Sequence, residues 1–314
     1  MTPAALLDRS RRGSLVWLAA CSIGQAGGAV IVALALGKAI GDGLSAATTC
    51  WMAFGGLLTA AAMLGERWAG EVLAQSLVSE LRLRLFDRLV ASKGVTNEAQ
   101  WLNPLVGDLA AIRNWAARGP VRLATAALAL FVTLFLFALQ MPYLALSGVP
   151  LGMAMLCFIP VGRRLAKEIR KQRLARGALT RFIVRRARIE ASGQIKANRH
   201  GRQSMRRRSG ELAKLAISRA RYFGLLEALA ACGSAAAAIT LAAVAARLSV
   251  APADVAAAAT LIGFMSSRLL EVARASHAAI GGYIAFARIA AVLSDADYPT
   301  ESSSHHKHRI DIDV

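Results

Sequence analysis

The apolar residues of this chain fall into blocks of about 20 residues that are almost free of charge. A soluble helix or strand would instead mix apolar and polar positions at its own period. At a rise of about 1.5 Å per residue, a helical block of this length crosses a hydrocarbon core of roughly 30 Å. The pattern therefore predicts an all-α membrane protein with six transmembrane helices, near residues 14–36, 46–64, 123–140, 142–162, 222–246 and 250–267.

Two connections between these blocks are long and show a helical pattern of their own. In residues 66–91, leucines such as Leu73, Leu77 and Leu81 recur at helical spacing among charged residues, and no Gly or Pro follows Gly70. Span two is therefore expected to continue as a helix beyond the membrane. After a break at 92–104, an amphipathic stretch at 105–122 leads back into span three.

The same arrangement returns between spans four and five. Residues 163–191 continue span four, a break is expected at 193–201, and residues 202–221 lead into span five. We therefore expect two intracellular hairpins, 66–122 and 163–221, within a membrane domain of residues 14–294. Each cytoplasmic extension would reach on the order of 30 to 40 Å from the membrane.

Arginine and lysine are distributed unequally along the chain, whose net charge is +19. The short connections carry little charge: Lys38 in the first, none around Met141, and Arg247 with Asp254 in the third. Residues 163–221 instead hold 20 basic and three acidic residues. Because basic connections stay in the cytoplasm, both hairpins and both termini are expected on the cytoplasmic side. The membrane is expected to be the plasma membrane, as the inner membrane of a bacterium. The charge is expected to contact anionic lipid rather than nucleic acid.

Several local patterns imitate other signals. Residues 1–13 resemble an export signal but fit better as a basic cytoplasmic lead-in to span one, because the following apolar run continues past Cys21. The four cysteines have no metal-site spacing and are expected to be small packing residues. A histidine cluster at 305–308 lies in a Ser-rich tail without further ligands, so no metal site is expected. Gly24 and Gly28 indicate close helix packing.

Four stretches resemble the transmembrane domain of ATP-binding cassette (ABC) exporters with the type I exporter fold. Residues 81–89 (LRLRLFDRL) are similar to the end of the second helix in that family, and 107–109 (GDL) to the start of the third. Residues 195–197 (IKA) resemble the second intracellular turn, and 287–293 (ARIAAVL) the end of the sixth helix. Residues 267–270 (SRLL) are similar to the type I secretion branch, whose members move peptides or proteins.

The resemblance implies a role for the tips of the two hairpins. In the family, short coupling helices at these tips dock into the ATP-binding domains. They would lie near residues 95–101 and 194–200 of this chain. The implied ATPase-coupling residues are Val95, Asn97, Trp101, Gln194, Ile195, Lys196, Asn198 and His200.

The chain contains no GxxxxGK[ST] loop, so no phosphate-binding cradle of that kind is present. The resemblance therefore places ATP and Mg on a partner or missing ATPase domain, and no enzymatic activity or cofactor is expected on this chain. Residues 295–314 are expected to be a linker or the start of that domain, because residues 310–314 alternate as a strand does. The sequence fits either a split or truncated exporter or a natural permease subunit with a separate ATPase.

Polar residues gather near the inner ends of spans five and six. They are candidates for lining an inward-facing cavity, and the alternative is a set of ordinary helical salt pairs, since three of them are spaced three apart. The candidates are Glu227, Arg268, Glu271, Arg274 and His277.

The expected function is that of an ABC exporter permease half, which pairs as a homodimer or heterodimer and moves a substrate out of the cytoplasm by alternating access. ATP hydrolysis on the partner domain would drive the movement. A non-transporting scaffold or regulator that keeps the exporter fold is the alternative. A membrane enzyme is disfavoured because no nucleophiles, bases or metal ligands converge within the spans.

Overall fold

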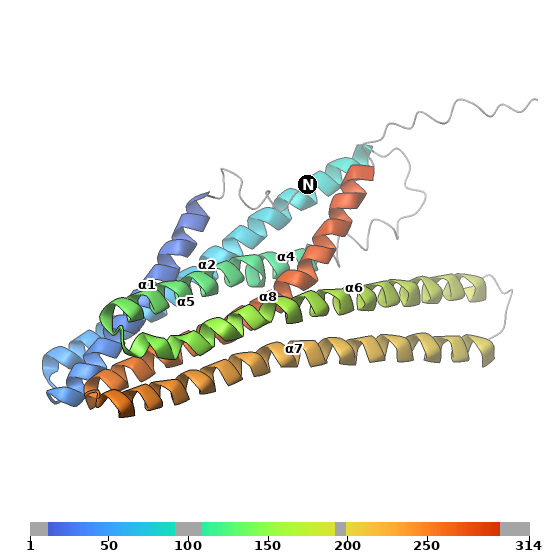
Figure 1. Ribbon diagram of the computed structural model, residues 1–314. Helices are drawn as coiled ribbons and strands as arrows, with labels where there is room; N and C mark the ends of the chain where they lie inside the picture. Colours follow the sequence, from blue (N-terminus) through green and yellow to red (C-terminus); the bar gives the residue numbers. More distant parts are fainter. Residues whose placement is uncertain (1–11, 92–108, 192–198, 296–314) are drawn as a thin grey trace, which may run out of the picture.

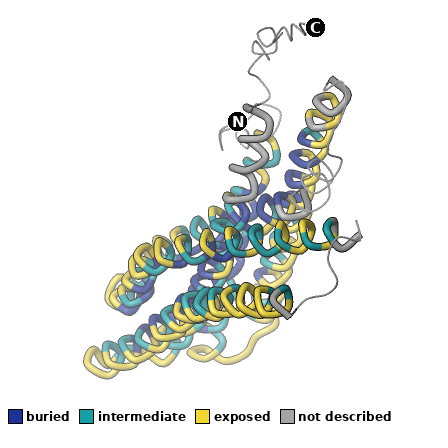
Figure 2. Tube along the Cα trace, turned by 90° about the vertical axis from the view of Figure 1, so that its right-hand side faces the viewer, coloured by how far each residue is buried: buried dark blue, intermediate teal, exposed yellow. Residues whose placement is uncertain are grey.

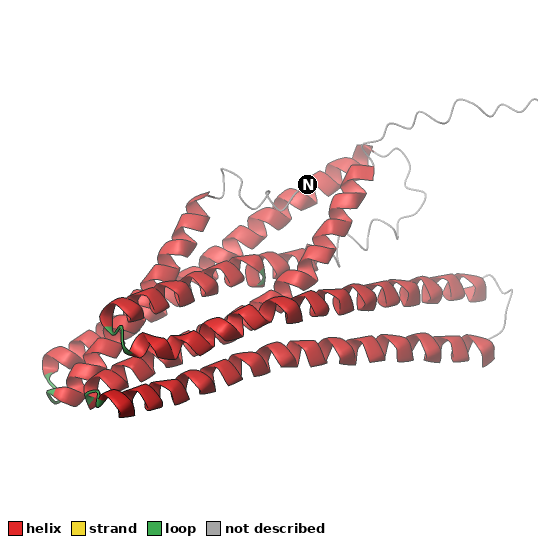
Figure 3. Ribbon diagram, viewed as in Figure 1, coloured by secondary structure: helices red, strands yellow, loops and turns green. Residues whose placement is uncertain are grey.

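The computed structural model describes residues 12–91, 109–191 and 199–295, and the chain is helical throughout these ranges apart from short turns (Figures 1 and 3). No strand occurs within them, which confirms the all-α fold class. The helices are α1 (Arg12–Gly41), α2 (Ala46–Ala91), α4 (Leu109–Arg118), α5 (Pro120–Gln140), the 3-10 helix η4 (Leu144–Gly148), α6 (Val149–Ala191), α7 (Arg199–Leu248) and α8 (Pro252–Asp295).

Six helical segments in the described part are long and apolar enough to cross a membrane. This confirms the six predicted spans, with α4 and α5 together forming the third of them, Ile112–Gln140. The bilayer core offers no water to hydrogen-bond with backbone N–H and C=O groups, and a helix pairs these groups within itself. The chain is therefore a multi-pass helical membrane protein.

One end of the bundle holds three short connections, and we call it the turn end. It contains the turns after α1, α5 and α7, which lie close together in Figure 1. A reciprocal cap begins α2, because the Ser45 backbone N–H donates to Thr48 Oγ1 (3.0 Å) and the Thr48 N–H donates to Ser45 Oγ (3.2 Å). Pro252 begins α8 at a position where its missing N–H costs nothing.

At the opposite end, which we call the arm end, four helices continue well beyond their apolar segments. Helices α2, α6, α7 and α8 contain 46, 43, 50 and 44 residues, so each is about 65–75 Å long. Figure 1 shows α6 and α7 running side by side to their far ends and diverging from α2 and the end of α8. Arg219 Nη1 donates to Gln172 Oε1 (3.0 Å) between them.

Three element boundaries differ from those predicted. Helix α7 already begins at Arg199, so residues 199–201 are helical rather than part of a break. Residues 142–148 form a turn and the 3-10 helix, and α6 begins only at Val149. The third segment is interrupted at Gly119, because Pro120 starts a new helix. The backbone of α8 also passes close to this point, since a Cβ at Gly119 would lie 2.8 Å from the Cα of Ala279.

The core lies along the axis of the bundle, where dark blue residues gather in Figure 2. Helix α8 packs against α1, α5 and α7, and α6 packs against α7. Much of the core is contributed by residues with no exposed surface, including Phe137, Leu165, Leu226, Met265 and Leu269. Large apolar side chains elsewhere, such as those on α2 and the outer faces of α5 and α6, remain exposed, as lipid-facing residues do.

The α1–α2 contact depends on glycine. A Cβ placed on Gly28 would meet Thr59 Oγ1 and lie 2.7 Å from the carbonyl oxygen of Gly55, and one on Gly24 would lie 3.5 Å from the Cβ of Ala62. The two backbones thus approach closely where small residues allow it. The expected role of Gly24 and Gly28 in close helix packing is confirmed.

Substitution of Gly28 by Ala is expected to lower the free energy of unfolding by about 1–3 kcal/mol, because α1 and α2 must separate to admit the methyl group. Gly27→Ala is the matched control. Nothing lies within 4 Å of its Cβ position, so this substitution should leave stability unchanged or raise it by up to about 1 kcal/mol. Thermal unfolding of both variants in detergent measures the difference, and equal midpoints would contradict this view of the contact.

Candidate functional site

A charged cluster joins α8 to α5 near the arm side of the bundle. Arg268 of α8 is only 4% exposed, and its Nη1 donates to Glu271 Oε2 over 2.8 Å. The other carboxylate oxygen of Glu271 pairs with Nε of Arg122 on α5 at 2.5 Å. The Arg268 guanidinium also lies 4.9 Å from the ring centre of Phe264. Glu271 is therefore held between two arginines from two helices.

A second group of side chains joins α8 to α7. Nε of Arg274 lies 2.9 Å from Glu227 Oε1, and both side chains are partly open to solvent. One turn further along α8, the ring of His277 lies 4.7 Å from that of Phe223 on α7, tilted by 47°. All five candidate cavity residues predicted from the sequence therefore lie on adjoining turns of α7 and α8.

The alternative prediction, of salt pairs within α8, describes only part of this arrangement. Arg268 and Glu271 do pair three residues apart, but Arg274 pairs with Glu227 of α7 instead. Arg122 was not among the predicted residues, and its position at the start of an apolar block was the available signal. With three arginines and two glutamates, the group carries a net charge of +1. Among the described residues, Nε of Arg268 is buried without a hydrogen-bond partner.

A buried polar cluster that the sequence did not predict ties α1, α2 and α5 together. Glu66 of α2 is 8% exposed and accepts two hydrogen bonds. Gln25 Nε2 of α1 donates to Glu66 Oε2 over 2.7 Å, and Thr125 Oγ1 of α5 donates to Glu66 Oε1 over 2.6 Å. Three helices therefore meet at one carboxylate.

The hydroxyl of Thr125 has a second acceptor within reach. Its Oγ1 lies 3.2 Å from the carbonyl oxygen of Arg122, one turn earlier in α5. Thr125 can therefore keep a hydrogen bond if the acceptor at Glu66 is changed, whereas Glu66 is the one acceptor of Gln25 Nε2 among the described residues. The cluster depends on the carboxylate mainly through Gln25.

Most of the predicted coupling residues lie outside the described residues: Val95, Asn97, Trp101, Gln194, Ile195, Lys196 and Asn198. His200 is the second residue of α7. Helices α6 and α7 lead to the second tip and α2 leads to the first. The tips themselves remain predictions.

The described residues contain no group of three or more His, Cys, Asp or Glu side chains that is placed to hold a metal ion. The histidines at 305–308 lie outside this part of the chain. Of the four cysteines, Cys21 is buried, whereas Cys50, Cys157 and Cys232 are exposed. The expectation that all four are small packing residues is therefore wrong for three of them, which are exposed on apolar helices.

Comparison of the chain with protein-family models and with curated proteins finds no match. The structure therefore defines the class of the protein. It is a helical membrane protein with six candidate spans, and four of its helices extend beyond their apolar segments.

Proposed function

We propose that the chain is the permease half of an ABC exporter with the type I exporter fold. The supporting observation is the length and pairing of α6 and α7, which continue together for about 30 Å or more past the apolar segments. Their residues 163–221 carry most of the basic charge, as cytoplasmic segments do. Of the stretches that resemble the exporter family, residues 81–89 lie near the end of α2, 287–293 lie near the end of α8, and 195–197 lie between α6 and α7 in the sequence.

The proposed mechanism is alternating access driven from outside the membrane. ATP and Mg bind to a separate or missing ATPase domain, which pushes on the hairpin tips. Contacts such as Arg219 to Gln172, and the guanidinium of Arg208 at 5.0 Å from the Phe182 ring, make α6 and α7 one stiff lever. The pairs Glu271–Arg122 and Glu227–Arg274 then carry the movement to α5, α7 and α8.

The same proposal defines the partners and the location. The permease half works as a homodimer or heterodimer in the plasma membrane, with both termini in the cytoplasm. The substrate passes from the cytoplasm to the outside, and the partly exposed pair of Arg274 and Glu227 lines its path. Anionic lipid contacts the basic residues nearest the membrane, because their charge lies within a Debye length of the headgroups.

Assembly with an ATPase tests this proposal. An affinity-tagged chain, purified in mild detergent from cells that also express an ABC ATPase encoded beside its gene, should retain that ATPase in a stable complex. Trp101→Ala at the first tip should release it at least about tenfold more readily, because an aromatic anchor at a docking tip is lost. Trp68→Ala is the matched control, since Trp68 is an exposed tryptophan on α2 near the base of the same hairpin and away from its tip.

A chain that purifies without the ATPase under these conditions would instead favour the scaffold function. Retention of the ATPase by Trp101→Ala to the same extent as by Trp68→Ala would contradict the role of the first tip.

A further inference from the structure

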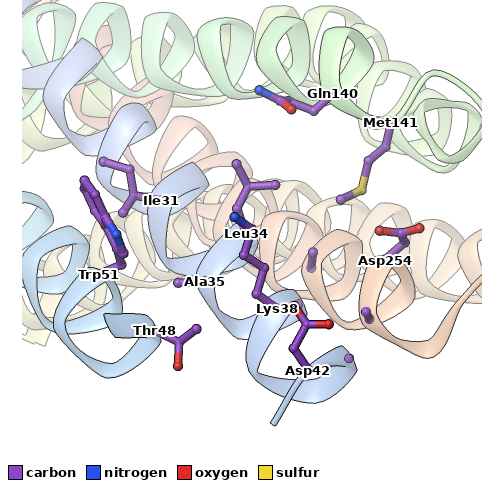
Figure 4. Close-up of a pocket in the computed structure, with 14 residues that line it drawn as sticks. Ile31, Leu34, Ala35, Lys38, Asp42, Thr48, Trp51, Gln140, Met141 and Asp254 are labelled. Atoms are coloured by element: carbon purple, nitrogen blue, oxygen red, sulfur yellow. The ribbon is translucent and has the colours of Figure 1, made fainter. Parts of the chain in front are cut away.

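The turn end of the bundle contains a pocket of about 560 Å³ between α1, α2, α5 and α8. This volume lies within the roughly 300–1,000 Å³ typical of small-molecule sites. Apolar side chains, among them Ile31, Leu34, Trp51 and Met141, form much of its wall. Figure 4 shows Trp51 on one side of the pocket and Asp254 with Met141 on the other, with Lys38 and Asp42 between them.

Three charged side chains line this pocket without partners. Neither Lys38, Asp42 nor Asp254 forms an ion pair or a side-chain hydrogen bond with another described residue. Their sum is a net charge of −1, opposite in sign to the +19 of the whole chain. The pocket is therefore a local negative site at the end of the protein where charge is scarce.

The position of Asp42 is unfavourable within the chain itself. It directly follows α1, and its backbone N–H donates to the carbonyl oxygen of Lys38 (2.8 Å), so its carboxylate lies at the negative end of the α1 dipole. Asp254, in contrast, lies in the first turn of α8, where a carboxylate is stabilised. A cation in the pocket would offset the repulsion at Asp42 and would also face Asp254.

We propose that this pocket binds an amphiphilic organic cation, meaning an ammonium or similar cationic group carried on an apolar body. Asp42 and Asp254 attract the cationic group, and the aromatic ring of Trp51, which also lines the pocket, offers it a second favourable contact. Ile31, Leu34 and Met141 bury the apolar body. Two sources supply this chemistry, the headgroup of an aminophospholipid in the membrane and a free organic cation. The site does not depend on the proposed transport function.

The test compares two ions of the same shape and opposite charge. The full chain in dodecyl maltoside micelles is titrated with tetraphenylphosphonium and, separately, with tetraphenylborate, and binding is followed by calorimetry. The phosphonium cation should bind saturably and the borate anion should not. Asp42→Asn and Asp254→Asn should each weaken cation binding roughly threefold and together about tenfold, whereas Lys38→Met should strengthen it.

Asp87→Asn is the matched control, because Asp87 is an exposed aspartate on α2 far from the turn end, and it should bind the cation as the unmodified chain does. Equal binding of the two ions, or unchanged cation binding by the double variant, would overturn the proposal. Phosphatidylethanolamine added to the micelles distinguishes the sources. Displacement of the phosphonium ion assigns the pocket to the lipid headgroup, and undiminished binding assigns it to a free cation. Either outcome supports a cation-binding site.

Discussion

Replacement of Glu66 by Ala is expected to lower the free energy of unfolding by about 2–4 kcal/mol, which corresponds to a fall of roughly 5–10 °C in the unfolding midpoint. The carboxylate accepts hydrogen bonds from Gln25 and Thr125, so its loss leaves the amide of Gln25 buried without any partner. It also opens a small cavity where α1, α2 and α5 meet. Thermal unfolding in detergent measures the effect.

Glu66→Gln is the control that separates hydrogen bonding from charge. A glutamine oxygen still accepts from Gln25, and its amide can donate to Thr125, whose hydroxyl then turns to the carbonyl oxygen of Arg122. We therefore expect a change within about 1 kcal/mol. If Glu66→Gln were as destabilising as Glu66→Ala, the cluster would depend on the negative charge and the hydrogen-bond explanation would be wrong.

Replacement of Glu271 by Gln is expected to cost about 2–4 kcal/mol of stability, because the buried guanidinium of Arg268 loses its counter-ion. An arginine does not shed its proton to escape this cost. Arg268→Met should change stability by only about 1 kcal/mol, since Glu271 keeps its pair with Arg122. Chemical unfolding of the purified chain measures both.

The double variant Glu271→Gln with Arg268→Met should recover much of the lost stability, since no buried charge then remains unpaired. Glu227→Gln is the matched control. Its partner Arg274 is 62% exposed, so this pair should contribute less than about 1 kcal/mol. Additive losses in the double variant would show that Arg268 does not depend on Glu271.

The six spans could be predicted because bilayer crossing leaves a local signature, a block of about 20 apolar residues. The continuation of α2 to Ala91 and of α6 to Ala191 was predicted for a similar reason, as leucines at helical spacing and the absence of Gly and Pro act within a few turns. Helix ends were less well predicted. Gly201 lies within α7, since one glycine costs a long helix only about 1 kcal/mol.

The polar clusters could be predicted only in part because their members come from distant positions in the chain. Glu227, Arg268, Glu271 and Arg274 stand out as charges near apolar blocks, but nothing local indicates that Arg274 pairs with Glu227 or that Arg122 joins Glu271. Gln25 and Glu66 lie 41 residues apart and meet only because α1 and α2 cross closely at Gly28. Such contacts follow from helix packing.

These clusters and the long helices together describe how an applied movement would spread. Arg219 and Gln172 join α7 to α6, and α8 is paired with α5 through Glu271 and with α7 through Arg274 and Glu227. Suppose that α6 and α7 move together as one lever while α2 moves separately with the first hairpin. The distance between α2 and α6 then changes, whereas the distance between α6 and α7 stays constant. Alternating access requires such a movement of one rigid part against another.

The distance between spin labels on α2 and α6 tests this most directly. Labels are placed at positions 83 and 174, where Leu83 and Leu174 are 63% and 72% exposed, in a variant that lacks the four native cysteines. Labelled chain is diluted with unlabelled chain in the proposed complex with an ATPase. A second pair at 174 and 217, both within the α6–α7 lever, is the control, since Ile217 is also exposed. We predict that the 83–174 distance differs between the nucleotide-free and vanadate-trapped complexes while the 174–217 distance is constant, and an unchanged 83–174 distance in a complex that hydrolyses ATP would contradict the proposed function.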